Sequence, residues 1–235
     1  MQNIKDKVAL ITGATKGIGY GIAETLLKQG VKVAITSRTQ ESADEAAKKL
    51  GANVLAIAAD VKDFKSQQDA VAKTIEKFGA LDVLVANAGV GHFAAIDELT
   101  VEDWQETINT NLTGVFYSVK AAVDALKKSK GYIITISSLA GTNFFENGSA
   151  YNASKFGLTG FTQAIMLDLR KHDVKVSTIM PGSVATHFAE HTPDKEKDAW
   201  KIQPEDIGQL VSDLLNMNPR TLPSKIEVRP TKTSN

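Results

Sequence analysis

The stretch TGATKGIG, Thr12 to Gly19, decides the fold. It follows an apolar run, Lys7 to Thr12, that reads as a buried strand, and it leads into a helical pattern that ends at Gly30. Glycines let the backbone turn tightly and approach a ligand closely. A helix N-terminus offers free N–H groups and the positive end of a dipole to a pyrophosphate. Because the motif stands between a strand and a helix, it predicts a dinucleotide-binding turn rather than a plain glycine-rich loop.

Apolar runs and helical patterns alternate along the rest of the chain. Strands that are apolar on both faces, each followed by a helix, predict a parallel sheet covered on both sides. We therefore expect one doubly wound α/β domain over residues 1–235, with a mostly parallel seven-stranded sheet and a substrate loop at about 187–202. The expected strands are 7–12, 32–37, 53–60, 81–89, 131–138, 174–182 and 224–230; the expected helices are 16–30, 39–51, 65–79, 100–129 with Thr100 as N-cap, one through Tyr151 to about His172, and one near 204–216.

Composition excludes several classes of function. The 27 Lys and Arg residues balance 27 Asp and Glu residues, so the chain lacks the basic excess of most nucleic-acid-binding proteins. There is no cysteine, which rules out disulfides and thiolate metal sites. No apolar run resembles a signal peptide or reaches membrane-spanning length. We predict a cytoplasmic protein with a small-molecule substrate, no metal, no nucleic-acid partner and no membrane contact.

The end of the second strand indicates which dinucleotide binds. NAD sites usually carry an acidic side chain there for the ribose 2′-hydroxyl, whereas this chain has Ser37 and Arg38. A guanidinium can make a forked contact with a 2′-phosphate. Lys16 in the glycine loop adds a second cation. Both cations could be ordinary surface residues, but their joint position predicts NADP(H).

A second constellation lies in SAYNASKFG, where Tyr151 and Lys155 are four residues apart. On a helix they share one face. A phenol has a pKa near ~10, and a neighbouring ammonium would lower it by favouring the phenolate. The pair could be a solvated helix face, or a proton donor held beside a fixed charge.

Six motifs in order resemble those of the compact, single-domain short-chain dehydrogenase/reductase family, which includes 3-oxoacyl-acyl-carrier-protein reductases and NADPH-dependent carbonyl reductases. They cover nearly the whole chain and are TGATKGIG, the NAG of Asn87 to Gly89, NLTG from Asn111, ISS to Ser138, the YNASK that holds Tyr151 and Lys155, and PGSVAT from Pro181. The resemblance implies a Rossmann fold and NADPH-dependent reduction of a ketone or aldehyde. One departure from the family is the C-terminus, where a VDGG-like ending is replaced by LPSKIEVRPT.

The resemblance also implies a catalytic set of Asn111, Ser138, Tyr151 and Lys155. Tyr151 would donate the proton, Ser138 rather than its neighbour Ser137 would hold the carbonyl oxygen, and Lys155 would hold the nicotinamide ribose. Asn111 would support a water beside Lys155, or could simply be a polar helix residue. The implied cofactor contacts are Gly13, Thr15, Lys16, Gly17, Ile18, Gly19, Ser37, Arg38, Asp60, Val61, Asn87, Ala88, Gly89, Tyr151, Lys155, Pro181, Gly182, Val184 and Thr186. Asp60, expected near the adenine, could instead merely end its strand.

Other functions remain open from the sequence. HFAEH, His187 to His191, matches the H-x-x-E-H zinc-peptidase pattern, in which His187, Glu190 and His191 would serve a metallohydrolase. A cofactor-binding sensor without catalysis is a further alternative, although Tyr151 and Lys155 are both present. A 3-oxoacyl-acyl-carrier-protein reductase would need cations to meet the acidic carrier. The candidates are Lys127, Lys128, Lys130, Arg170 and Lys171, which also suit ordinary helix ends.

The substrate pocket should come from Leu139 to Gly148, from His92 and Phe93, and from the loop between His187 and about Trp200. Its apolar candidates are Phe144, Phe145, Phe188 and Trp200. The family resemblance further implies a homodimer or homotetramer built on the fourth and fifth helices. Apolar positions that would permit this are Trp104, Ile108, Val115, Val119, Phe156, Gly160 and Ala164.

Overall fold

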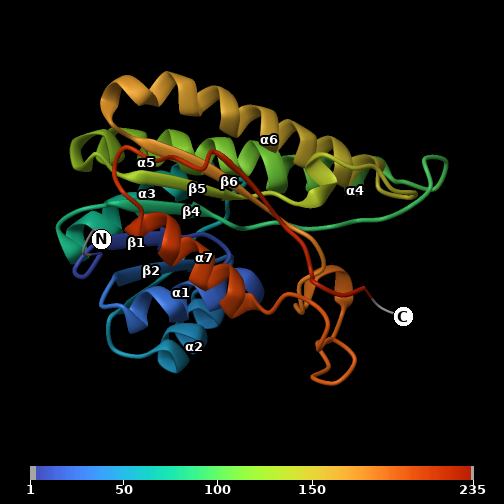
Figure 1. Cartoon of the computed structure of the whole chain (residues 1–235), viewed down its shortest axis with the longest axis horizontal. Helices are drawn as coiled ribbons and strands as arrows, with labels where there is room; N and C mark the ends of the chain where they lie inside the picture. Colours follow the sequence, from blue (N-terminus) through green and yellow to red (C-terminus); the bar gives the residue numbers. More distant parts are fainter. Residues whose placement is uncertain (1–3, 234–235) are drawn as a thin grey trace.

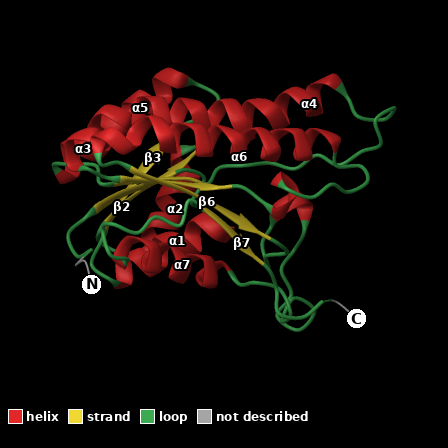
Figure 2. Ribbon diagram, turned by 45° about the horizontal axis from the view of Figure 1, so that its top comes forward, coloured by secondary structure: helices red, strands yellow, loops and turns green. Residues whose placement is uncertain are grey.

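The computed structural model describes residues 4–233, in which one seven-stranded sheet lies between two layers of helices (Figures 1 and 2). The strand order is β3-β2-β1-β4-β5-β6-β7, and each neighbouring pair is parallel. The doubly wound Rossmann fold is therefore confirmed. The strands are β1 (Val8–Ile11), β2 (Lys32–Ser37), β3 (Val54–Ala58), β4 (Val83–Ala86), β5 (Tyr132–Ile136), β6 (Lys175–Pro181) and β7 (Lys225–Val228).

Each face of the sheet has its own apolar core. Successive strand residues point to opposite faces, so Ile11 packs into one core and Leu10 into the other. On the first face lie α1 (Gly17–Lys28), α2 (Gln40–Leu50) and α7 (Pro204–Asn216); on the second lie α3 (Phe64–Phe78), α5 (Gly114–Ser129) and α6 (Ser149–Leu169), with α4 (Val101–Ile108) extending beyond the sheet (Figures 1 and 2). No helix of this described part is long and apolar enough to cross a membrane.

The helix expected over residues 100–129 is interrupted. It begins as predicted, because the Thr100 hydroxyl accepts a hydrogen bond from the Asp103 N–H at 3.0 Å. Between α4 and α5, however, residues Asn109–Thr113 form a π-helical turn. Such a turn holds an extra residue and is common at functional sites. Here it carries Asn111, whose side chain is bonded to the loop after β4.

Two expected surface positions are wrong in the same region. Val115 and Val119 of α5 are buried in the core against the sheet, so they are not available for contact with another subunit. The neighbouring Phe116 is exposed instead. The sequence pattern alone assigned the outward face to the wrong residues because the inward face of α5 is apolar as well.

The topology brings the conspicuous loops to one edge of the sheet. The strand order reverses between β1 and β4, and ligands of open α/β sheets bind at such a switch point, beyond the carboxyl ends of the strands. The glycine loop follows β1, Asn87 follows β4, and Ser138 follows β5. Tyr151 lies in the first turn of α6, which returns from that edge (Figure 1).

Candidate active site

The glycine loop lies tightly against the segment that follows β4. Gly13 has a φ of 63°, which is in the left-handed region that favours glycine. A Cβ atom on Gly13 would stand 2.8 Å from the Cα of Ala88, closer than real contacts allow. Glycine is therefore required at this turn by both backbone conformation and space.

Hydrogen bonds from the β4 side hold this turn. The Thr12 hydroxyl accepts from the backbone N–H groups of Asn87 at 3.0 Å and Ala88 at 3.1 Å. The Asn87 amide donates to the carbonyls of Thr12 at 2.9 Å and Gly13 at 3.0 Å. Asn87, expected to line the ribose, thus uses its amide nitrogen to shape the loop. Thr12, buried at the end of β1, was not singled out from the sequence.

The start of α1 fits a diphosphate group. Lys16 precedes the helix without a side-chain cap, and the first turn, with Gly17, Ile18 and Gly19, contains no acidic residue. The free N–H groups and the positive dipole end are therefore uncompensated by the protein itself. Thr15 stands in the loop just before, and Thr186 lies across it, 3.3 Å from the position of a Cβ on Gly17.

The residues expected around the adenine end follow β2 and β3. Ser37 ends β2, and Arg38 and Lys16 are exposed. Among the described residues neither cation has a hydrogen bond or ion pair. The Asp60 carboxylate accepts from the Lys62 N–H at 2.9 Å, so its side chain helps to form the loop after β3. Val61 next to it is buried.

The predicted reacting residues converge in space. The Lys155 Nζ atom lies 5.6 Å from the centroid of the Tyr151 ring and donates to the Ile136 carbonyl at 3.0 Å. Ser138 hydrogen-bonds to the Tyr151 hydroxyl and begins the short turn Leu139–Gly141. Ser137 is buried beneath α6, where its hydroxyl bonds to the Lys155 carbonyl and to Thr159. The geometry therefore brings Ser138, not Ser137, to the phenol.

The pKa of Tyr151 differs from the sequence-based expectation. Burial raises it to about 12, and the hydrogen bond with Ser138 offsets only part of that rise. Burial also lowers the pKa of Lys155 to about 8. The expected lowering of the phenol pKa is therefore wrong for this structure, because loss of solvation is the largest influence on Tyr151.

Asn111 is placed beside the lysine by the π-helical turn. It is 1% exposed, and its amide group accepts from the Val90 N–H and donates to the Val90 carbonyl, both at 2.8 Å. It also donates to the Ser154 hydroxyl at 3.1 Å. A Cβ on Gly89 would lie 3.2 Å from the Asn111 Oδ1 atom and 3.8 Å from the Lys155 Nζ atom. Gly89, Asn111 and Lys155 thus meet at one point.

The segment after β6 closes the same edge. The Gly182 N–H donates to the Val228 carbonyl at 2.8 Å, which ties the turn at Pro181 to β7. Val184 pairs with Ile202, so the two ends of the expected substrate loop are joined.

Comparison with known proteins agrees with this geometry. The family model for short chain dehydrogenases matches residues 7–197. The chain belongs to the short-chain dehydrogenase family. A trans-4-hydroxycyclohexanecarboxylate dehydrogenase of Sinomonas cyclohexanicum is 38% identical over 192 residues, which cover 78% of this chain and 74% of that protein.

Two solved structures resemble this short-chain dehydrogenase over nearly its whole length. An alcohol dehydrogenase of the archaeon Thermococcus sibiricus, complexed with 5-hydroxy-NADP, has a TM-score of 0.88 and 31% identity, covering 96% of this chain and 97% of its own. A 3-ketoacyl-(acyl-carrier-protein) reductase of Brucella melitensis, complexed with NADH, has a TM-score of 0.89 and 27% identity, covering 97% and 98%. The family is one of oxidoreductases that use nicotinamide cofactors. One of these two structures carries an NADP derivative and the other carries NADH.

The zinc-peptidase pattern is not realised in this short-chain dehydrogenase. Phe188–Glu190 form a single 3-10 turn with a positive φ at Ala189, so His187 and His191 do not share the face of an α-helix. His191 instead bonds to Asp198 at 2.6 Å. Among the side chains that the structure describes, which do not include that of Glu190, no group of three or more His, Asp or Glu residues could hold a metal ion.

Asp198 holds the expected substrate loop together and was not recognised from the sequence. It is 4% exposed, and its carboxylate pairs with Lys201 at 2.6 Å in addition to His191. The backbone N–H of Asp194 donates to it at 3.0 Å. These partners hold the pKa of Asp198 far below its usual range, so its carboxylate is charged at neutral pH.

Two of the four aromatic candidates reach Tyr151. Phe145 and Phe188 pack around its ring together with Phe93, whereas Trp200 makes no ring contact with it among the described residues. Phe144 stacks on Phe156, with ring centroids 5.1 Å apart.

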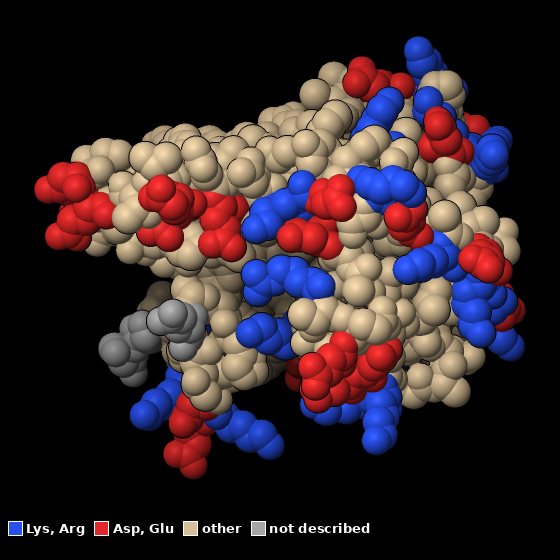
Figure 3. All heavy atoms as spheres, turned by 180° about the vertical axis from the view of Figure 1, so that it is seen from behind, with Lys and Arg blue, Asp and Glu red and all other residues tan. Residues whose placement is uncertain are grey.

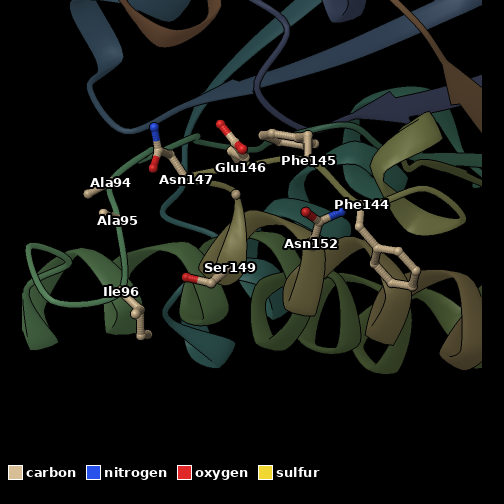
Figure 4. Close-up of a pocket in the computed structure, with 10 residues that line it drawn as sticks. Ala94, Ala95, Ile96, Phe144, Phe145, Glu146, Asn147, Ser149 and Asn152 are labelled. Atoms are coloured by element: carbon tan, nitrogen blue, oxygen red, sulfur yellow. The ribbon is translucent and has the colours of Figure 1, made fainter.

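A surface groove runs alongside this ring cluster (Figure 4). The neighbouring Phe144 and Phe145 side chains point in different directions in that view. Neither Tyr151, Ser138 nor Lys155 lines the groove, so the groove is separate from the predicted reacting groups. Its lining residues are Ala94, Ala95, Ile96, Phe144, Phe145, Glu146, Asn147, Gly148, Ser149 and Asn152.

Proposed function

We propose that this short-chain dehydrogenase reduces a ketone or aldehyde to an alcohol with NADPH, and catalyses the reverse reaction, with Tyr151 as general acid and base. The observation that carries the proposal is the joint position of Tyr151, Ser138 and Lys155 at the edge where the glycine loop opens. A dinucleotide on that loop would bring its nicotinamide toward these side chains.

The chain supplies proton transfer and orientation. A reduced nicotinamide supplies the hydride that forms the new C–H bond when it is bound. The Tyr151 hydroxyl gives its proton to the carbonyl oxygen as the carbonyl carbon accepts the hydride. Ser138 donates a hydrogen bond to the same oxygen. Lys155 would hold the ribose of the bound cofactor, and its positive charge would stabilise the phenolate left on Tyr151. Asn111 fixes the segment beside Lys155.

NADPH rather than NADH is favoured by charge. Arg38 and Lys16 are exposed on the two loops where a 2′-phosphate would lie, and no acidic residue lies between the end of β2 and Glu41 to hold a free 2′-hydroxyl. The alcohol dehydrogenase of Thermococcus sibiricus, which carries an NADP derivative, is consistent with this preference.

Reduction of a 3-oxoacyl group on a carrier protein is the second candidate, and the Brucella melitensis reductase favours it. The distribution of charge opposes it. Lys127 and Lys128 lie in the last turn of α5, just before β5 begins, whereas Ser138 follows its end. These cations therefore stand at the opposite edge of the sheet. Near the site, Asp and Glu side chains gather over the end formed by α4 and its preceding loop (Figure 3). They include Asp97, Glu98, Glu102 and Asp103.

We also propose a cytoplasmic homo-oligomer. Phe116 and Phe156 on the outer surfaces of α5 and α6 are 45% and 36% exposed. Exposed apolar patches of this kind often mark contact surfaces.

The test is NADPH oxidation at 340 nm with a panel of ketones, aldehydes and 3-oxoacyl thioesters, with NADH in parallel. Tyr151→Phe should lower kcat/KM by roughly 10²- to 10⁴-fold, the usual contribution of a positioned general acid. It should change the affinity for NADPH much less than kcat/KM, because the ring remains and only one hydroxyl contact is lost. Arg38→Ala should raise the KM for NADPH and leave that for NADH unaltered.

The role of Tyr151, the preference for NADPH and catalysis itself can each be refuted separately. Full activity in Tyr151→Phe would remove the tyrosine from the mechanism. A preference for NADH would refute the role given to Arg38 and Lys16. NADPH binding without turnover on the whole panel would favour the non-catalytic sensor.

A further inference from the structure

Three phenylalanine rings surround the phenol of Tyr151. The ring centroids of Phe93, Phe188 and Phe145 lie 5.4, 5.5 and 6.4 Å from that of Tyr151. Phe93 follows β4, Phe145 precedes α6, and Phe188 follows β6. Segments that are distant in the sequence thus deliver one kind of side chain to one point, which we name the phenyl ring cluster.

Two glycines make room for these rings. A Cβ on Gly91 would stand 2.5 Å from the Cζ of Phe188 and 3.0 Å from that of Phe93. A Cβ on Gly148 would stand 2.5 Å from the Phe145 ring. The Ala94 N–H also donates to the Asn147 carbonyl at 3.0 Å, which joins the segments that carry Phe93 and Phe145. The cluster is therefore built into the backbone rather than placed by chance contacts.

The rings still present apolar surface to a ligand. Phe93, Phe145 and Phe188 are 43%, 46% and 37% exposed, although they pack against one another. Exposed aromatic rings gain by contact with another ring, edge to face or offset, beyond the gain from buried area alone. A flat ring next to a carbonyl would meet such contacts while its oxygen reaches Tyr151.

The charges around the cluster disfavour anionic substrates. His92, next to Phe93, is drawn to α4, where its ring nitrogens lie 3.3 Å from Asp103 and 3.2 Å from Glu106. Lys155 is buried beneath the phenol, and Lys201 is paired with Asp198. Each of these basic groups already has a partner, and the acidic residues of α4 lie nearby. A carboxylate or phosphate on the substrate would gain little here.

We propose that the phenyl ring cluster selects uncharged aryl ketones and aldehydes, in which an aromatic ring is joined directly to the carbonyl carbon. This selection rests on the carbonyl reduction proposed above. Flexible aliphatic ketones and acyl thioesters of similar carbon number lack the ring contacts and lose more conformational freedom on binding.

The experiment compares acetophenone with 2-octanone, which has the same number of carbon atoms, at saturating NADPH. The wild-type kcat/KM should favour acetophenone by at least about 10-fold. Phe93→Leu, Phe145→Leu and Phe188→Leu should each lower this ratio by roughly 3- to 10-fold, mainly through KM, because leucine keeps the apolar volume and removes the ring. Phe144→Leu is the matched control and should preserve the ratio, since that ring stacks on Phe156 instead.

Saturation-transfer NMR measures the binding of the two ketones to the protein in the presence of NADP⁺. This measurement separates the proposed selection of aryl ketones from the proposed carbonyl reduction. Absence of turnover with both ketones would refute the proposed function alone. Tighter binding of acetophenone, lost in the leucine variants, would still support the cluster. The proposal would be overturned if kcat/KM were equal for the two ketones. It would also be overturned if all three variants kept the wild-type preference for acetophenone while thermal melts showed them to be folded.

Discussion

Burial shifts the pKa of both Tyr151 and Lys155 in the direction that favours the uncharged form. The pKa of Tyr151 is raised to about 12 and that of Lys155 is lowered to about 8. The phenol therefore stays protonated throughout the physiological range and carries the proton that carbonyl reduction requires. The lysine is the group whose charge changes near neutral pH.

The pH dependence of carbonyl reduction should follow Lys155. Because its pKa lies at about 8, the ammonium is present below that pH and is lost above it. We expect kcat/KM with NADPH to be level from about pH 6 to 7.5 and to fall above pH 8, toward a tenfold decrease per pH unit. Initial rates in buffers of constant ionic strength measure this profile.

Lys155→Arg is the control for that prediction. Arginine keeps its charge at every pH used, so any remaining activity should lose the fall above pH 8. A fall at the same pH in this variant would assign the titration to another group.

At the scale of single residues, the sequence predicted which candidate reacting groups come together but not their electrostatics. Tyr151 and Lys155 follow from their spacing on a helix, and Ser138 follows from the family resemblance. The direction of the Tyr151 pKa shift was predicted wrongly, because it depends on solvent exclusion by segments far away in the sequence, such as those of Phe93 and Phe188. The buried Asp198 was missed for the same reason, since its partners meet only in the folded loop.

At the scale of elements, the π-helical turn at Asn109–Thr113 is the feature that positions Asn111. Its amide satisfies both the N–H and the carbonyl of Val90. A regular helix would carry one residue fewer in this turn, and Asn111 would then be rotated relative to α4, which precedes the turn. The sequence pattern predicted a single long helix, because the apolar spacing on either side is helical and one widened turn leaves no compositional mark.

Removing the Asn111 amide should destabilise the protein. Asn111→Leu would leave two part-buried backbone groups of Val90 without their side-chain partner, at a cost of up to about 1–3 kcal/mol for each group. We expect a decrease of roughly 2–5 kcal/mol in the free energy of unfolding by urea, and a loss of reductase activity as the loop beside Lys155 shifts.

Asn109→Leu is the matched substitution in the same turn, because Asn109 is exposed. It should change the free energy of unfolding by less than about 0.5 kcal/mol. Equal effects of the two substitutions would show that the turn, and not the Val90 contacts, sets the stability.

At the scale of the whole molecule, the parallel order β3-β2-β1-β4-β5-β6-β7 sets the position of the site. Most of this architecture could be predicted, because doubly apolar strands alternate with helices whose ends carry glycine or capping residues, as at Thr100 and Gly79. Which helical face looks outward could not be predicted on α5, where Val115 and Val119 face the core beside the exposed Phe116. Two apolar faces on one helix are indistinguishable without the fold.

The exposed faces of α5 and α6 should join subunits. Light scattering after gel filtration is expected to give a mass at least twice the 25.2 kDa of one chain. Phe116→Asp should lower that mass by placing a charge in the contact, whereas Ile96→Asp, at a position 77% exposed before α4, should not. A mass of one chain for the wild type at micromolar concentration would contradict the proposed oligomer.

The ring cluster and the proton-transferring groups have different origins in the chain. Tyr151 and Lys155 stand one turn apart on a single helix packed against the sheet, whereas Phe93, Phe145 and Phe188 come from three connecting segments. Connections accept substitution and changes of length far more readily than packed helices do. A descendant of this protein could thus exchange every ring and keep the reaction. In such a lineage the reaction would be inherited with the helix, whereas the choice of substrate would be free to diverge with the connecting segments.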